Sequence, residues 1–420
     1  MKLISQYRGL KKEFYVLFIG RLVTAMGSFV WPMMTFLMTV KLGLSDSLAT
    51  LLIAISGLLS LPAAIVGGKL ADHFSRKSII IVFDCLTVSL YVLAFFLPIS
   101  YFTLGAVFLA GLFQTMESPA YDALNSDFST TEQRERAFSL SYLGFNLGYV
   151  VGASVSGLLF ENHTNLAFLL NGLSIFTSTV LIMLFVHMKN AVVNTGEKEE
   201  AYSEYEQPVD EKRPVLSVLK DRKVVLFVML IGCIASMPLN LCGILLPLQL
   251  KETMGGGLGA EIYGYLNSLN GFVVILFTPL LTLTLRKLTE LPKAAIGMAL
   301  FMIGMVLFAF EWAVWVLFAG MFIYTVGEVV SVLGENPYSS RRIPASHRGR
   351  IGGITMVIHS VFSTFTQLVI SGVLYLTESN YMLIWLVFIS IGLAAGVLYL
   401  LAYRPDKKRF PKLYSSSGCR

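Results

Sequence analysis

Long apolar segments alternate with short polar ones along almost the whole chain. Leu51–Val66 and Ile79–Leu97 are mostly apolar, and the polar segment Gly68–Lys77 separates them. About 20 apolar residues are enough for a helix to cross the ~30 Å hydrocarbon layer of a bilayer. Twelve segments are predicted to do so: Phe14–Met38, Leu48–Val66, Ile79–Leu97, Thr103–Leu124, Ala137–Leu159, Leu166–Val186, Val224–Leu246, Ile262–Leu285, Ala294–Phe310, Val314–Leu333, Ile351–Leu376 and Leu383–Tyr403.

These segments must be helices, because no water inside a bilayer can satisfy open backbone groups. The alternating pattern of a transmembrane β-barrel is absent. Composition agrees, since 55% of the residues are hydrophobic and 14% are charged, against about 25% charged residues in soluble domains. The sequence therefore predicts an all-α membrane protein with twelve transmembrane helices, and it argues against a large soluble protein.

One long polar segment, rich in Glu and poor in aliphatic residues, separates the sixth apolar segment from the seventh. Such a composition is typical of a solvated linker. The predicted domains are therefore an N-terminal six-helix bundle (1–186), a cytoplasmic linker (187–222), and a C-terminal six-helix bundle with a cytoplasmic tail (223–420).

The two predicted halves resemble each other weakly. Glu117 precedes Asn125 by eight residues in the fourth span, and Glu328 precedes Asn336 by eight residues in the tenth. Parallel six-helix repeats of this kind are typical of transporters that bind substrate between their halves. We therefore expect two bundles related by pseudo-two-fold symmetry.

The distribution of positive charge predicts the orientation of the chain. With the amino terminus inside, only Lys41 and Lys251 of the 32 Lys and Arg residues fall in outer loops, and only Arg21 lies within a span. The other 29 face the cytoplasm. We expect both termini to be cytoplasmic and the protein to lie in the cytoplasmic (plasma) membrane. The net charge of +6 is then a topology signal and not the mark of a nucleic-acid partner.

Motifs for other kinds of chemistry are missing from the sequence. There is no phosphate-binding loop, no zinc-protease motif and no nucleophile elbow, and the five histidines are scattered. We therefore expect no enzymatic activity, no cofactor and no metal, and we expect a monomer in membrane lipid.

The polar segment Gly68-Lys-Leu-Ala-Asp-His-Phe-Ser-Arg-Lys77 resembles the loop between the second and third helices of major facilitator superfamily transporters. The family pattern reads approximately G-x-L-A-D-R-x-G-R-K. His73 and Ser75 differ from it, and the matching residues are Gly68, Leu70, Ala71, Asp72, Arg76 and Lys77.

A second loop, which begins at Asp127, resembles the loop that follows the fourth helix in this family. In relatives an aspartate at this position pairs with the arginine of the first motif, which is Arg76 here. Asp72 would face the start of the eleventh helix, where the helix dipole favours an anion. The resemblance implies a cytoplasmic latch formed by Gly68, Asp72, Arg76, Lys77 and Asp127. The alternative is a set of solvated loop charges.

Charged residues inside spans are costly and indicate function by default. Glu328 is our first candidate for a proton carrier, because desolvation favours a protonated carboxyl that can release its proton near neutral pH. Its surroundings resemble the tenth span of the lactococcal-type multidrug antiporters. The alternative is a carboxylate held by hydrogen bonds to a neighbouring helix. Glu117 is either a second proton site or a partner for Arg21. We expect Asp84 to be structural.

Two further features of the spans allow more than one interpretation. In the fifth span Gly144, Gly148, Gly152 and Gly157 form a ridge of small residues. The ridge resembles the glycine motif of antiporters, although Ala153 replaces its proline, and close helix packing explains it equally well. His359 is either a proton relay or a packed, hydrogen-bonded residue.

These features together predict a proton-coupled transporter that resembles the twelve-span drug:proton antiporters. It would export lipophilic or cationic small molecules by alternating access, driven by the proton gradient. A transporter of a polar metabolite such as a sugar, amino acid or siderophore is the alternative. A lipid flippase, a non-catalytic membrane protein or an intramembrane enzyme would belong to other classes.

Overall fold

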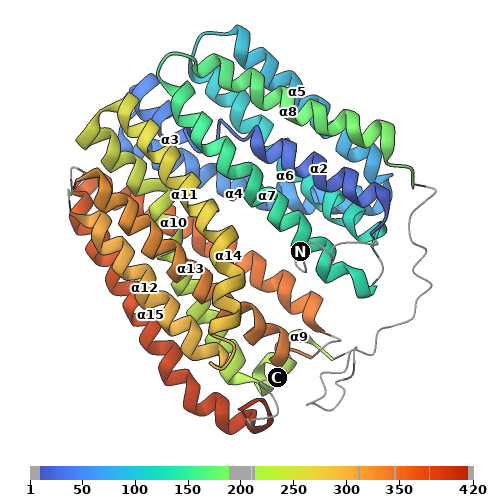
Figure 1. Ribbon diagram of the computed structural model, residues 1–420, viewed down its shortest axis with the longest axis vertical. Coiled ribbons are helices and arrows are strands. Elements are labelled where there is room, and N and C mark those ends of the chain that lie inside the picture. Colours follow the sequence, from blue (N-terminus) through green and yellow to red (C-terminus); the bar gives the residue numbers. More distant parts are fainter. Residues whose placement is uncertain are drawn as a thin grey trace. The chain divides into compact units, whose positions relative to one another are not determined.

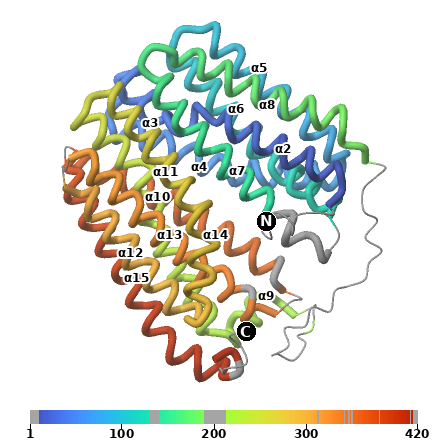
Figure 2. Tube along the Cα trace, in the orientation of Figure 1, coloured from blue at the N-terminus to red at the C-terminus, as the bar shows by residue number. Residues whose placement is uncertain are grey.

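A computed structural model describes residues 10–129, 131–188, 210, 213–310, 313–344, 347–377 and 379–414. The regular structure of these residues is helical throughout (Figures 1 and 2). The elements are α2 (Lys12–Met26), α3 (Met34–Phe36), η1 (Leu37–Lys41), α4 (Asp46–His73), α5 (Arg76–Phe96), α6 (Tyr101–Asp127), α7 (Thr131–Phe160), α8 (Thr164–Phe185), α9 (Val215–Asp221), α10 (Lys223–Met254), α11 (Gly256–Thr284), α12 (Glu290–Ala309), α13 (Val314–Arg342), α14 (Arg348–Leu376), α15 (Tyr381–Arg409) and η4 (Pro411–Tyr414).

Eleven of the twelve predicted spans each fall on one helix, and the predicted all-α membrane fold is confirmed. Ten helices of the described residues are long and apolar enough to cross a membrane. The first predicted span is broken instead, because α2 ends after 15 residues and a turn leads to α3 and η1. The amide of Val30 in this turn bonds the Asn171 side chain at 3.3 Å, which satisfies a buried donor. The fourth span, α6, carries three acidic residues.

The loop between the second and third spans is shorter than expected. α4 continues to His73 and α5 begins at Arg76, so only Phe74 and Ser75 connect the two helices. The prediction of a loop over Gly68–Lys77 was therefore wrong in its bounds. Six of its ten residues continue α4, because only Gly67 and Gly68 weaken the helix there and neither has to adopt a positive φ.

The described helices group into two compact units. Unit 1 comprises Met1–Glu197 and Pro247–Ile275, and unit 2 comprises Lys198–Leu246 and Leu276–Arg420. The last part of α10 and the first part of α11 thus belong to unit 1. The boundaries that we expected at residues 186 and 223 remain a prediction, and most of the predicted linker lies outside the described residues.

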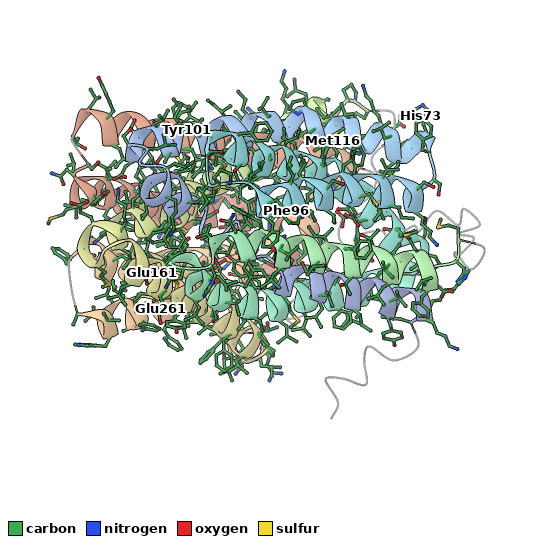
Figure 3. The ribbon with its side chains drawn as sticks, turned by 90° about the horizontal axis from the view of Figure 1, so that it is seen from above. His73, Phe96, Tyr101, Met116, Glu161 and Glu261 are labelled. Atoms are coloured by element: carbon green, nitrogen blue, oxygen red, sulfur yellow. The ribbon has the colours of Figure 1, made fainter. Side chains whose placement is uncertain are left out.

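Two apolar clusters fill the core of unit 1, one toward each end of its helices. One contains Phe14, Ile80 and Tyr121, and the other contains Val30, Tyr91 and Phe168. Figure 3 shows that His73 lies at one end of the helices and that Glu161 lies at the opposite end. We call the His73 end the basic end, because the motif cations Arg76 and Lys77 follow it.

In unit 2, α12 and α13 pack with almost no space between their backbones. A methyl group on Gly297 would overlap the backbone of Ser331, and one on Gly327 would overlap the backbone of Phe301. Small residues permit such close approach between membrane helices. Large apolar side chains instead cover the outer faces, as with Leu376 (79% exposed) and Leu401 (63% exposed), which suits contact with lipid.

Candidate functional site

The basic end of unit 1 carries the motif residues. The guanidinium of Arg76 at the start of α5 pairs with Asp127 at the end of α6, and it also donates to the carbonyl oxygen of Ala123 at 3.3 Å. The pair is half-buried. The pairing that the resemblance implied is therefore present, and it joins two neighbouring helices of one unit.

Lys77 has a different role at the same end. Its ammonium group donates to the carbonyl oxygens of Met183 (2.9 Å) and Val186 (2.7 Å), at the carboxyl end of α8. A cation at this position satisfies carbonyls that have no helical partner and complements the helix dipole. Asp72 is exposed on the last turn of α4, and its role in a latch remains a prediction.

The close contact near this motif is made by a residue that the motif did not indicate. A methyl group on Gly68 would meet open space, whereas one on Gly67 would overlap the backbone of Met116 in α6. The motif glycine is therefore not the one that brings α4 and α6 together. Glycine preceding glycine in the sequence was the only signal, and it does not show which of the two faces the neighbour.

Buried charges gather inside unit 1 around Arg21. Asp84 of α5 and Glu117 of α6 are 7% and 8% exposed, and the charge of Arg21 acts on both. The guanidinium lies over the rings of Tyr121 (5.1 Å) and Phe145 (5.8 Å). Arg21 and Glu117 are both described, and they form no ion pair with each other.

Asp84 is more than a peripheral residue. The Thr179 hydroxyl of α8 donates to its carboxylate at 2.6 Å, and its charge acts on Glu117. The structure thus brings together three of the charged residues that the sequence placed in separate spans. We define Arg21, Asp84 and Glu117 as the unit 1 charge cluster.

Glu328 lies on α13 in unit 2 and is partly buried. The Glu328 carboxyl interacts electrostatically with the Cys242 thiol of α10. This thiol is also hydrogen-bonded to Tyr324, which lies one turn before Glu328 on α13. Tyr324 stacks against Phe301 of α12, with the ring centroids 4.1 Å apart. The carboxyl therefore has an aromatic neighbourhood on one side and a buried cysteine on another.

Glu335, seven residues after Glu328, was missed by the sequence reasoning. Its Oε1 accepts hydrogen bonds from Ser331 and from Tyr399 of α15, each at 2.9 Å. Glu335 and Tyr399, together with His359 and Gly232, line a cavity of about 180 Å³ inside unit 2. A carboxyl and an imidazole therefore share one enclosed space. No local signal marks it, because Tyr399 is 64 residues away in the sequence.

The glycines of the fifth span contact two different helices. In α7, Gly148 and Gly152 lie against the backbone of α2, where added methyl groups would be 2.5 Å from the Leu22 oxygen and 2.7 Å from the Ala25 oxygen. Gly144 lies against the ring of Phe18. Gly157 instead lies against α11, where an added methyl group would be 2.6 Å from the Ala260 oxygen. The ridge is a close packing surface, and an antiporter role for it remains a prediction.

The two cations that we expected in outer loops both have partners within unit 1. Lys251, near the end of α10, pairs with the buried Asp46 at the start of α4. Lys41 donates to the carbonyl oxygen of Glu161, just after α7, at 2.7 Å. The segment Pro247–Ile275 is held further by Ser268, whose hydroxyl lies 2.6 Å from that of Ser154 in α7. These contacts close the end of unit 1 that is opposite the basic end.

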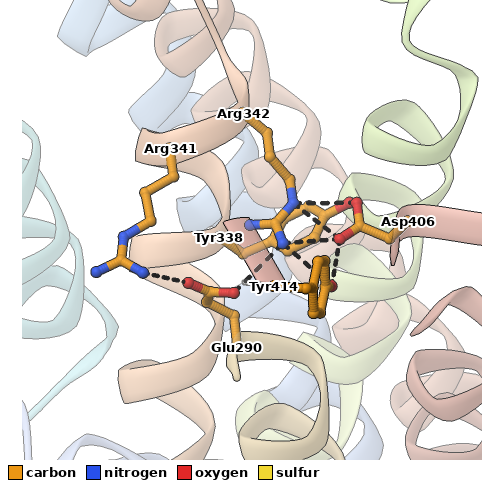
Figure 4. A network of polar contacts seen from close by, with 6 residues as sticks. All are labelled: Glu290, Tyr338, Arg341, Arg342, Asp406 and Tyr414. Carbon is orange, nitrogen blue, oxygen red and sulfur yellow. Dashed lines mark hydrogen bonds and ion pairs between the residues drawn. The ribbon is translucent and has the colours of Figure 1, made fainter. Parts of the chain in front are cut away.

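A buried ionic network ties three helices of unit 2 to the C-terminal turn (Figure 4). Arg342 and Asp406 are both fully buried, and the guanidinium donates through Nη2 at 2.7 Å and through Nε at 3.0 Å. Glu290 accepts from Arg341 at 2.7 Å and from Arg342 at 3.3 Å. Tyr414 of η4 donates to Asp406 at 2.5 Å. We call Glu290, Arg342, Asp406 and Tyr414 the Arg342 network.

The charges of this network stabilise one another. Burial opposes the charge of Arg342, but the hydrogen bond and negative charge of Asp406 outweigh it, and the pKa of Arg342 rises above its usual value. Burial and the bond to Asp406 also raise the pKa of the Tyr414 hydroxyl, which keeps this group a donor.

Comparison with known proteins identifies the family. A model of the Major Facilitator Superfamily matches residues 17–367. The chain belongs to the major facilitator superfamily. It is accordingly a multi-pass membrane transporter, and family membership indicates a transporter of small molecules rather than an enzyme.

Relatives within the superfamily differ in what they carry. The chain is 26% identical over 328 residues to a Na(+), Li(+), K(+)/H(+) antiporter of Planococcus maritimus, covering 72% of this chain and 76% of the relative. It is 28% identical over 162 residues to the multidrug resistance protein MdtH of Yersinia enterocolitica, covering 38% and 40%.

Solved structures share the fold at low sequence identity. A POT family transporter in complex with 5-aminolevulinic acid aligns with a TM-score of 0.74 at 15% identity, covering 95% of this chain and 96% of that chain. The nucleoside transporter NupG aligns with a TM-score of 0.70 at 12% identity, covering 92% and 100%. These likenesses show the fold of the superfamily.

Proposed function

We propose that this major facilitator protein is a proton-coupled antiporter that exports lipophilic or cationic small molecules from the cytoplasm. The proton gradient drives it, with no bound cofactor, and it works as a monomer in the cytoplasmic membrane. Kinship with a cation/proton antiporter and with a multidrug resistance protein supports this class of substrate.

The observation that carries the proposal is an excess of carboxyls over cations at membrane depth. In unit 1, Asp84 and Glu117 share the single charge of Arg21. In unit 2, Glu328 and Glu335 lie on the span Val314–Ser339, which contains no Lys or Arg. A carboxylate in apolar surroundings is costly, whereas a protonated carboxyl or one beside a bound cation is less so. Such a group exchanges a proton for a cationic substrate.

Exchange of a monovalent metal cation for protons is a second candidate function. It uses the same carboxyl chemistry, and the relative from Planococcus maritimus, which aligns over 72% of this chain, is such an antiporter. The two functions differ in the size and hydration of the cation. A panel that includes both kinds of cation separates them.

The test uses everted membrane vesicles with an acidified interior and a pH-sensitive dye. A lipophilic cationic dye added to vesicles with the protein should release protons, and Na⁺, Li⁺ or K⁺ should release fewer. Release by the metal cations alone would support the second function. No release by either would overturn the proposal of cation/proton antiport.

Glu328→Gln should abolish this exchange while leaving the protein in the membrane. The amide keeps the size of a protonated carboxyl but cannot ionise, so it neither releases a proton nor offsets a cationic substrate. Glu252→Gln, which removes an exposed carboxyl of α10 outside these sites, is the matched control. Should Glu328→Gln exchange at the wild-type rate, Glu117 becomes the leading carrier, and Glu117→Gln is then the variant to measure.

Orientation has its own test, because export requires the basic end to be cytoplasmic. In a protein without native cysteines, Glu252→Cys should react with an impermeant thiol reagent added to intact cells. Lys408→Cys should react only in everted vesicles. Both side chains are exposed, so accessibility within the protein is matched. Reaction of Lys408→Cys in intact cells would reverse the predicted topology.

A further inference from the structure

A second cavity of unit 2 lies beside the Arg342 network and has a different character from the Glu335 cavity. It encloses about 270 Å³ where the end of α11, the start of α12 and the end of α13 meet the turn η4. Three cationic side chains line it: Arg286, Lys293 and Arg341. Its other walls are mostly apolar, with Leu281, Leu333 and Leu413 among them.

The charges of this cavity do not balance. Arg341 is offset by Glu290 at 2.7 Å, and the neighbouring Arg342 is offset by the buried Asp406. Arg286 and Lys293 form no ion pair with any described residue. Arg286 is exposed and Lys293 is partly buried, so two positive charges remain at the edge of the cavity. A bound anion would offset them.

The start of α12 adds to this preference. The cavity is lined by Thr289, which precedes α12, and by Glu290, the first residue of that 20-residue helix. The Thr289 side chain caps none of the amide groups of α12. Amides at a helix amino terminus attract anions through their free N–H groups and the helix dipole. The cationic side chains and the start of α12 thus both favour the binding of an anion.

The surroundings of the cavity suit a ligand with an apolar part. On α11, Leu280 and Leu283 flank the lining residues Leu281 and Thr282, and Leu288 of the following loop lines the cavity itself. These three leucines are 52%, 66% and 38% exposed, which suits contact with lipid. Pockets that enclose a whole drug-sized ligand usually hold about 300–1,000 Å³. The smaller volume here fits the phosphate head of a lipid whose acyl chains remain outside.

We propose that this cavity binds the phosphate head group of an anionic phospholipid from the adjoining leaflet. Arg286 and Lys293 contact the phosphate, the start of α12 adds dipolar attraction, and the acyl chains lie along the exposed leucines of α11. Basic pockets between transmembrane helices on the cytoplasmic side are known to suit such head groups. Since η4 provides Leu413 and anchors Tyr414 to the Arg342 network, an occupied cavity also holds the C-terminal turn in place.

The experiment measures lipid binding to the purified, delipidated protein by native mass spectrometry. Phosphatidylglycerol should bind more tightly than phosphatidylcholine. The double variant Arg286→Gln/Lys293→Gln should bind phosphatidylglycerol about 25-fold more weakly, because each basic residue near an anionic lipid surface contributes a factor of about five. The matched control, Lys287→Gln/Lys408→Gln, removes two exposed charges that do not line the cavity. It should change binding less than about twofold, because salt screens exposed charges that lie away from the bound phosphate.

Several outcomes would overturn the proposal. Equal losses in the two double variants would mean that diffuse surface charge attracts the lipid. Equal binding of the two lipids would mean that only the apolar groove is recognised. If inorganic phosphate or glycerol 3-phosphate binds as tightly as phosphatidylglycerol, the cavity is a site for a soluble phosphate compound. If the double variant does not accumulate, Arg286→Gln alone carries the same test with an expected loss of about fivefold.

Discussion

Two ionic sites, one in each unit, hold helix ends together in different ways. In unit 1 the Arg76–Asp127 pair is half-buried and joins neighbouring helices through one carboxylate. In unit 2 the Arg342–Asp406 pair is fully buried and is completed by Glu290, Tyr338 and Tyr414. A half-buried pair breaks at low cost, because water replaces the lost partner. A fully buried pair has no such replacement. The first site suits a contact that opens during transport, and the second suits a permanent anchor.

The largest effect should come from breaking the buried site. Asp406→Asn leaves Arg342 charged and without its main partner, and removing one member of a buried ion pair costs about 3–5 kcal/mol. We expect a large loss of thermal stability in detergent, measured by circular dichroism, and a lower amount of protein in the membrane. The exposed Asp221→Asn, which breaks the pair with Arg213, is the control and should change stability little. Wild-type stability of Asp406→Asn would mean that water reaches Arg342.

A smaller loss should follow removal of one hydroxyl from the same network. Tyr414→Phe deletes the donor to Asp406 at 2.5 Å and the acceptor from Arg342 at 3.2 Å, and it keeps the ring. Hydrogen bonds to charged groups contribute about 1.5–3 kcal/mol. The stability, measured as for Asp406→Asn, should fall by a smaller amount than in that variant. Tyr403→Phe, whose ring packs edge-on against Tyr414, is a matched control. An equal loss in both variants would assign the effect to ring packing.

The smallest effect on stability should come from the half-buried site, and there activity should change more than stability. Asp127→Asn breaks a pair worth about 0–1 kcal/mol. If Asp72 and Asp127 belong to one latch, each single substitution to Asn should impair transport, and the double variant should lose less than the sum of the two. Additive losses of transport rate in everted vesicles would mean that the two residues act independently.

Prediction from sequence succeeded where one strong physical constraint applied. The bilayer forces apolar segments into helices, so hydropathy alone located the eleven spans from Leu48–Val66 to Leu383–Tyr403. The Arg76–Asp127 pair was also predictable, because a family motif linked two loops that lie 51 residues apart. The structure of the first span was less predictable, since the break after Met26 depends on the Asn171 side chain of a distant helix.

The sites of unit 2 could not be predicted in the same way. Glu290, Arg342 and Asp406 lie at helix ends, where charged residues are common and carry no signal of burial. Only tertiary packing makes Arg342 and Asp406 inaccessible to water. Glu335 was overlooked because it lies near the end of its predicted span. The hydroxyl of Tyr399, which accounts for its position, belongs to the last helix. Residues became informative here through partners far away in the sequence.

The close packing of Gly297 and Gly327 has a mechanical consequence for Glu328. Because the backbones of α12 and α13 touch, neither helix can slide or rotate against the other without a clash. The two helices therefore move as one rigid pair. Glu328 directly follows Gly327 on this helix pair. Any change in the space around its carboxyl must therefore be accommodated by the neighbouring α10, where Cys242 lies. The reactivity of Cys242 toward a thiol reagent would therefore report each displacement of the α12–α13 pair.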